Sequence, residues 1–257
     1  MRKLLMLCFL LLISSNAFGR GIFPANLSST RACISGNDSY TVLMIHSNNT
    51  DGSQTFTDTA SGTTEVGGKT LTANGQVQHD TSFYKFAISG VSFDGTGDYI
   101  STPTHSAWEF GTGDFGIGFW LRLTKDSDSI LISNHSGVPA VDNWYFQYKK
   151  TGNGLAFYNY PGASEKAVAW APSLDTWYHI EVSRSGTGLY FFVDGVQVGA
   201  TQNVTGWDLN VTTSLAIGCG ANGSTQPLSG HLDEIIIKKG AALHTAAFTP
   251  PTLPYCD

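Results

Sequence analysis

Charged residues are scarce in this sequence, and glutamate is the scarcest. Only 13% of the 257 residues are charged, about half the usual ~25% of a globular domain. The 14 Lys and Arg residues face 20 Asp and Glu without forming a basic block, which excludes a basic nucleic-acid-binding protein. An aromatic share of 12% excludes a disordered acidic tail. The five Glu against 15 Asp argue against a helical protein, because Glu favours helices.

Long apolar runs are also absent, apart from one at the N-terminus. Arg2 and Lys3 precede the apolar run 4–13, and the small residues Ala17 and Gly19 follow it. This order is typical of a cleavable secretory signal, and the run is shorter than the ~20 residues that span a bilayer. We predict a signal peptide over 1–19 and a secreted, extracellular chain (periplasm or virion surface included) without membrane insertion; a membrane anchor is the alternative.

Cysteine is rare, with four residues. Cys8 lies inside the apolar run. Because the chain is expected to be exported, the other three cysteines can form disulfides, which persist in oxidising compartments. Cys33 precedes the first strand-like segment and Cys256 is the penultimate residue. We predict a Cys33–Cys256 disulfide that joins the two ends, with Cys219 as a small buried residue; three free thiols are the alternative.

Abundant Ser, Thr and Asn supply the polar surface instead of charge, with 25, 27 and 13 residues. After a Ser/Asn-rich arm over 20–39, short runs of alternating apolar and polar residues recur between Gly, Asn and Asp, as in strands joined by turns. Ile117, Phe119 and Leu121 would face one side of a strand, and Trp120 the other. The expected strands are 40–46, 69–73, 90–93, 98–101, 117–123, 129–133, 144–149, 154–159, 165–170, 177–182, 189–193, 196–198, 213–218 and 230–238.

The turns between these runs carry their own signals. Asp194-Gly195 predicts a two-residue hairpin, and the Gly- and Asp-rich stretch 94–98 predicts another. Outside the signal, only 241–244 could form a helical turn. A dozen or so short strands in this length indicate an all-β, antiparallel, two-sheet sandwich as a single domain over 40–257.

Eight segments follow one another in a specific order along the chain. They are 40–46 (YTVLMIH), 55–58 (TFTD), 91–100 (VSFDGTGDYI), 108–115 (WEFGTGDF), 175–179 (DTWYH), 193–195 (VDG), 230–235 (GHLDEI) and 248–252 (FTPPT). Their order resembles the laminin-G-like, concanavalin-A-like jelly-roll family. Each segment is a weak signal alone, but the ordered series is specific, and it is similar to the variant common in bacterial secreted and phage tail-associated proteins. The resemblance implies the jelly-roll fold and a habit of binding, and fixes no activity.

The resemblance also implies one structural calcium ion. The acidic residue of the family's last core strand often contributes to that site, and here this position is Asp233. Asp51 or backbone carbonyls near Asn48 would complete the six to eight oxygen ligands. The alternative is that Asp233 caps a turn or pairs with Lys238 or Arg122.

Catalysis is the minority interpretation. Hydrolases with this fold place two Glu and an Asp on one strand, and retaining hydrolysis needs two carboxyl groups about 5 Å apart. No two of the five Glu lie within 15 residues of each other, so this strand motif is missing.

Aromatic residues beside polar turns are candidates for stacking on sugars. Trp120 and Trp177 lie within strand runs and are expected in the core. The alternative for each candidate is also the core, since sandwiches of this size bury most aromatics. The candidate ligand-binding residues are Trp144, Trp170 and Trp207, with Tyr158 and Tyr160 as a second aromatic edge.

We therefore expect a secreted, non-catalytic recognition module that binds carbohydrate or a glycosylated surface. The second hypothesis is a structural, self-assembling subunit of an extracellular or virion assembly, with 20–39 as a docking arm. The third is a glycoside hydrolase.

Overall fold

The computed structural model describes residues 32–62, 68–86, 88–134, 143–152, 154–160, 164–210, 213–220 and 223–257. Contacts divide the chain into the units 1–31 and 32–257, and every described residue belongs to the second unit. The predicted signal peptide and the first part of the predicted arm lie outside the described residues. No helix among the described segments is long and apolar enough to cross a membrane.

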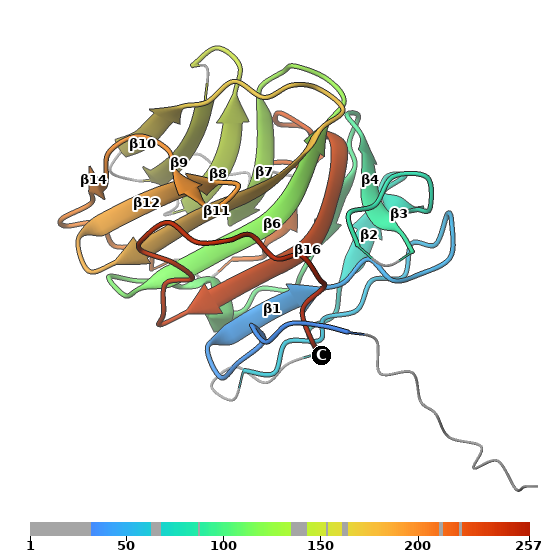
Figure 1. Cartoon of the computed structure of the whole chain (residues 1–257), viewed down its shortest axis with the longest axis horizontal. Coiled ribbons are helices and arrows are strands. Elements are labelled where there is room, and N and C mark those ends of the chain that lie inside the picture. Colours follow the sequence, from blue (N-terminus) through green and yellow to red (C-terminus); the bar gives the residue numbers. More distant parts are fainter. Residues whose placement is uncertain are drawn as a thin grey trace, which may run out of the picture. The chain divides into compact units, whose positions relative to one another are not determined.

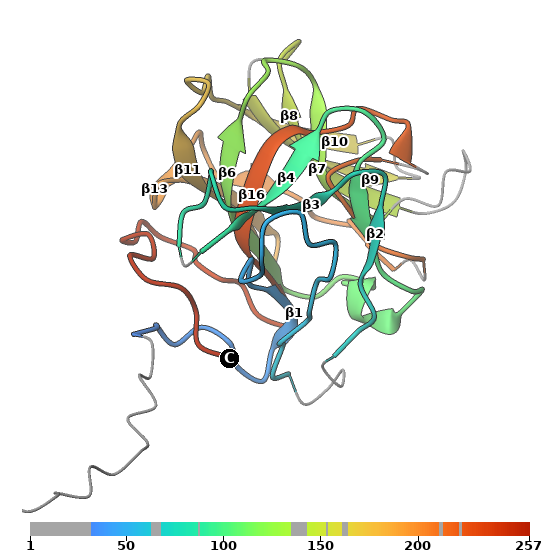
Figure 2. The ribbon, with the colours of Figure 1, turned by 90° about the vertical axis from the view of Figure 1, so that its right-hand side faces the viewer.

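Two antiparallel sheets pack face to face in the 32–257 unit (Figures 1 and 2), which confirms the predicted fold class. The first sheet has nine strands, in the order β13 (Val196–Gln197), β12 (Gly188–Val193), β11 (Trp177–Ser185), β6 (Phe115–Leu123), β16 (Ser229–Lys239), β4 (Gly90–Asp94) and β3 (Gln78–Asp80), with β1 (Thr41–Ile45) on β16 and β14 (Gln202–Asn203) on β12. The second sheet has seven, in the order β10 (Ser164–Ala169), β9 (Gly154–Tyr160), β8 (Asn143–Lys149), β7 (Ser129–Asn134), β15 (Ala216–Ile217), β5 (Tyr99–Ser101) and β2 (Thr72–Asn74). One 3-10 helix, η1, covers Ser106–Trp108.

The core lies between the sheets and follows the alternation of the strands. On β6, Ile117, Phe119 and Leu121 point into it, as the sequence pattern predicts. The rings of Phe119 and of Phe146 on β8 lie 5.9 Å apart and join the two sheets. Each large apolar side chain buried in this way contributes about 1.5–3 kcal/mol to folding, so the period-two pattern is the main source of stability.

The outer face of the nine-stranded sheet is covered by other parts of the chain. Figure 1 shows the C-terminal segment 240–257 crossing in front of this sheet. The Phe248 ring of this segment packs edge-on against His179 of β11. From the loop 82–86, the Lys85 ammonium lies 3.7 Å from the centre of the Trp120 ring. Trp120 is therefore buried by this covering loop rather than in the core between the sheets, and Trp177 is only half-buried.

The two ends of the described unit are tied together as predicted. Cys33 and Cys256 form a disulfide across 223 residues of sequence, and Cys219 is buried with a free thiol. Beside the disulfide, Ile34 and Tyr255 form a parallel β-bridge. Residues 32–39, which the sequence assigns to the arm, are thus packed against the jelly-roll unit.

Most predicted strands are present, and the differences lie in the connections. Strands β3 and β14 were not expected, and residues 241–244 form no helical turn. Asp194 and Gly195 both have positive φ, as a two-residue hairpin turn requires. The turn over 94–98 is not a hairpin, because β4 and β5 belong to different sheets. The Asp98 carboxylate accepts the Asp94 and Gln76 N–H groups and so directs the chain from one sheet to the other.

Candidate ligand-binding site

Three tyrosine rings form a row on the outer face of the seven-stranded sheet. Tyr145 on β8 lies directly opposite Tyr158 on β9, and their rings are stacked with centroids 4.8 Å apart and planes 11° apart. Tyr160 follows two residues later on the same face, 5.9 Å from Tyr158 and tilted by 28°. All three are half-buried. The three rings therefore form one aromatic cluster on this face.

Polar side chains border the tyrosine row on the same face. Glu165 on β10 lies opposite Tyr158 in the sheet register. Its carboxylate accepts hydrogen bonds from Lys149 Nζ at 2.9 Å and from Gln147 Nε2 at 3.4 Å. Donors and acceptors thus stand next to aromatic rings, which is the combination that sugars need, because they present both apolar C–H faces and hydroxyl groups.

The hydroxyls of Tyr145 and Tyr158 stay protonated at neutral pH. Burial, together with Tyr158 and the Glu165 charge, raises the pKa of Tyr145 to about 12. Burial also raises the pKa of Tyr158, with Tyr160 and Glu165 acting in the same direction. Neither these two hydroxyls nor that of Tyr160 bonds to another described residue, so each can donate to and accept from a ligand.

Strand alternation explains why these tyrosines share the outer face, and it could also have identified the third one from the sequence. Leu155 and Phe157 point into the core. Tyr158 and Tyr160 alternate with them along β9, so their side chains point to the outer face. Tyr145 was not among the predicted residues. It alternates with the buried Trp144 and Phe146, and this alternation was the signal that could have identified it.

Two of the predicted ligand-binding tryptophans are wrong. Trp144 is fully buried, stacks on Phe110 and donates its indole N–H to the Trp108 carbonyl. Trp207 is also buried, against Phe157. Both border polar turns in sequence, but their side chains face the core. Trp170 is half-buried and packs edge-on against two tyrosines, away from the row, namely Tyr148 and Tyr178.

Asp233 does not have the surroundings of a calcium ligand. Its buried carboxylate accepts N–H groups of Lys85 and Phe86 at 2.9 and 3.0 Å, and of Glu234 at 2.9 Å. These N–H groups occupy three of the roughly four acceptor positions of the carboxylate, where a cation would otherwise bind. Burial raises the pKa of Asp233 to about 7. The alternative, that Asp233 caps a turn, fits these contacts.

Asp51 also lacks a calcium-like environment. One of its oxygens accepts the N–H and hydroxyl of Thr81, at 3.0 and 3.1 Å. Across the described ranges, no group of three or more His, Cys, Asp and Glu side chains could hold a metal ion. Calcium binding stays a prediction for which these two residues supply no site.

Buried glutamates on the nine-stranded sheet hold the covering segments. Glu181 accepts His244 Nδ1 at 2.7 Å and the Ser183 hydroxyl at 2.7 Å. Glu234 accepts His46 Nδ1 at 2.8 Å and the Tyr255 N–H at 2.8 Å. Each carboxylate is thus paired with a histidine and with a neighbouring donor, and fastens the C-terminal segment to the sheet.

The comparisons with known proteins agree with this architecture. The family model of the concanavalin A-like lectin/glucanases superfamily matches residues 94–244, more than half of the chain. The chain belongs to this superfamily. No curated protein matches it in sequence.

Several solved structures share the fold at low sequence identity. The binding domain of Paraclostridial Mosquitocidal Protein 1 is 13% identical, with a TM-score of 0.59, over 80% of this chain and 50% of that one. The ligand-binding domain of botulinum neurotoxin serotype D, in complex with N-acetylneuraminic acid, is 10% identical, with a TM-score of 0.59, over 80% and 48%. The chain therefore spans about half the length of these binding domains, and the likeness shows the fold alone.

Proposed function

We propose that this protein is an exported, non-catalytic recognition module that binds carbohydrate through the tyrosine row Tyr145–Tyr158–Tyr160. The observation that carries the proposal is a row of stacked, half-exposed rings with free hydroxyls beside Gln147 and Glu165. The similar fold of toxin binding domains, one of them in complex with N-acetylneuraminic acid, supports a binding role.

The tyrosine rings and their polar neighbours would make different contacts with a sugar. A sugar ring placed against the tyrosine rings would bury its apolar C–H groups, while its hydroxyls would bond to the phenols and to Glu165. One aromatic contact contributes about 0.5–1.5 kcal/mol, and one hydrogen bond about 0.5–1.5 kcal/mol. Truncating one tyrosine should therefore weaken binding about tenfold, because 1.4 kcal/mol corresponds to a factor of ten.

A glycan array with the purified protein tests this function. We expect selective binding that falls about tenfold in Tyr158→Ala and in Tyr160→Ala. The matched control is Tyr190→Ala, since Tyr190 is also a half-buried strand tyrosine, stacked on Phe192, but lies on the other sheet. Near-UV circular dichroism checks that each variant is folded. Equal binding by Tyr158→Ala and the control, or no binding to any glycan, would reject the proposal.

A further inference from the structure

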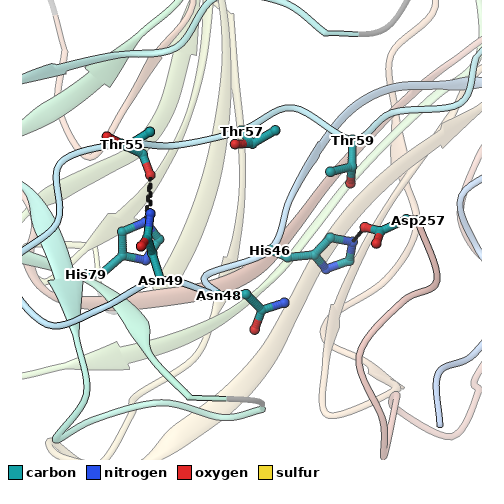
Figure 3. Close-up of a pocket in the computed structure, with 8 residues that line it drawn as sticks. All are labelled: His46, Asn48, Asn49, Thr55, Thr57, Thr59, His79 and Asp257. Atoms are coloured by element: carbon teal, nitrogen blue, oxygen red, sulfur yellow. Dashed lines mark hydrogen bonds and ion pairs between the residues drawn. The ribbon is translucent and has the colours of Figure 1, made fainter. Parts of the chain in front are cut away.

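A pocket of about 210 Å³ lies away from the tyrosine row, between the loop that follows β1 and the end of the C-terminal segment. Figure 3 shows the His46 ring and the Thr59 side chain on either side of it, with the Asp257 carboxylate beside them. All of its lining residues have polar side chains. The lining residues are His46, Asn48, Asn49, Thr55, Thr57, Thr59, His79 and Asp257.

Two polar atoms in this lining are buried without a hydrogen-bond partner. They are His46 Nε2 and Thr59 Oγ1. The His46 side chain is only 6% exposed. Asp257 Oδ1 lies 3.3 Å from His46 Nε2 and forms an ion pair with it, but the two atoms do not have the geometry of a hydrogen bond. A buried polar group that makes no hydrogen bond is unfavourable, so these two atoms are suited to form hydrogen bonds with a ligand.

Two other side chains of the same pocket, His79 and Asn49, are already hydrogen-bonded. His79 Nε2 contacts the Thr55 carbonyl at 3.0 Å, and its Nδ1 faces the hydroxyls of Ser47 and Ser89. The Asn49 side chain bonds to the backbone of Thr50 and Thr55. Among the lining residues, the buried polar atoms that lack a partner thus belong to His46 and Thr59, which lie beside Asp257.

The arrangement around His46 has the chemistry of a hydroxyl-binding site. Because Glu234 accepts from Nδ1, a protonated His46 ring presents an N–H at Nε2. A hydroxyl oxygen can accept from this N–H while its own hydrogen is donated to the Asp257 carboxylate or to Thr59 Oγ1. An anion is a poorer ligand, because the carboxylates of Asp257 and Glu234 lie within reach of the ring. A polyol with adjacent hydroxyls satisfies both unpaired atoms together.

We infer that this pocket is a second binding subsite, which takes one neutral sugar residue through adjacent hydroxyl groups. The inference rests on the proposed carbohydrate-binding function but uses a different surface. Burial disfavours the charge on His46, yet the bond to Glu234 and the carboxylates of Asp257 and Asp233 outweigh it and raise the pKa of His46. This supports the donor at Nε2.

The test follows the His46 ring signals by NMR while the purified protein is titrated with single sugars. The probes are D-galactose, D-mannose, N-acetylglucosamine and, as an anionic comparison, N-acetylneuraminic acid. We expect at least one neutral sugar to shift the His46 signals at millimolar concentration. If no neutral sugar does so, the pocket holds water only and the inference is wrong.

The variant Thr59→Val separates an effect on sugar binding from an effect on folding. Thr59→Val keeps the shape of the side chain and removes only the unpartnered hydroxyl. We expect it to weaken sugar binding about three- to tenfold, the value of one hydrogen bond, while its thermal midpoint stays equal or rises. Asp257→Asn should also weaken binding without loss of stability, because Asp257 is 82% exposed. The control Thr50→Val makes the same change on an exposed turn outside the pocket. Unchanged binding in Thr59→Val overturns the inference.

Tyr158→Ala distinguishes this inference from the proposed function. If the tyrosine row is the main site, Tyr158→Ala loses binding on the array but keeps the sugar-induced shift at His46. If Tyr158→Ala binds the array normally and Thr59→Val does not, the tyrosine proposal fails and the pocket stands. If Thr59→Val keeps its sugar affinity while Tyr158→Ala loses array binding, the pocket fails and the tyrosine proposal stands.

Discussion

His179 should make the protein sensitive to acid. Its ring is 2% exposed and lies between Trp120 and Phe248, at centroid distances of 5.4 and 5.6 Å. Its Nδ1 atom is buried and has no hydrogen-bond partner. Burial, together with the charges of His244 and Lys85, lowers its pKa from 6.5 to about 3. The folded protein therefore holds this ring neutral at pH values where the unfolded chain binds a proton.

The size of the effect follows from this difference in pKa. Below pH 6.5 the unfolded state takes up more protons at His179 than the folded state, so stability is lost as the pH falls from 6.5 towards 3. Each unit corresponds to about 1.4 kcal/mol. The loss attributable to His179 is then about 2 kcal/mol at about pH 5, and approaches about 5 kcal/mol near pH 3.

The variant His179→Phe isolates this contribution, because it keeps an aromatic ring in the cage and cannot be protonated. We expect urea unfolding, followed by tryptophan fluorescence, to show that the wild type loses about 2 kcal/mol more than the variant between about pH 7.5 and pH 5. All other titrating groups are common to both proteins and cancel in the comparison. Parallel pH curves for the two proteins, or an NMR titration of His179 near its ordinary value, would refute the reasoning.

Three further predictions concern the fold. Replacing Cys33 and Cys256 together by Ala should lower the free energy of unfolding by up to about 5 kcal/mol, because the disulfide closes a very long loop; an unchanged urea midpoint would contradict this. Gly195→Val should destabilise by about 2 kcal/mol or more, because φ is +75° and a Cβ would lie 1.9 Å from the Phe248 carbonyl oxygen; an unchanged thermal midpoint would count against the hairpin geometry. Trp144→Phe should cost about 1–3 kcal/mol by leaving a buried carbonyl unpaired, with glycan binding unchanged; a selective loss of binding would restore Trp144 as a ligand-binding residue.

The strands were predictable because their signal is local. Alternation on β6 places Ile117 and Phe119 in the core whatever the other strands do. The turn at Asp194-Gly195 was equally predictable, since Asp-Gly is a preferred pair for a turn with positive φ at both positions. The turn over 94–98 has similar residues, yet it connects different sheets. Which sheet a strand joins depends on partners far away in sequence, and no local pattern records it.

The candidate sites show the same division. Tyr158 and Tyr160 were identified from sequence as aromatic residues at an edge, but their stacking on Tyr145 depends on the register between β8 and β9. Trp144 and Trp207 were misjudged because polar neighbours in the sequence say nothing about which face a side chain occupies. The pocket at His46 joins the loop after β1 with Asp257, across more than 200 residues of sequence.

The low charge and the five widely spaced glutamates already specified a turn-rich β-protein without the strand motif of the fold's hydrolases. Composition and alternation reflect whether each residue prefers water or the core, and this preference does not depend on distant parts of the chain. The sequence alone therefore determined the fold class. Only the tertiary structure decided what the glutamates do. Glu181 and Glu234 are buried opposite histidines from distant segments and fasten the C-terminal segment to the sheet. These pairings form because a buried carboxylate requires a hydrogen-bonding partner, and the fold alone determines which partner is within reach.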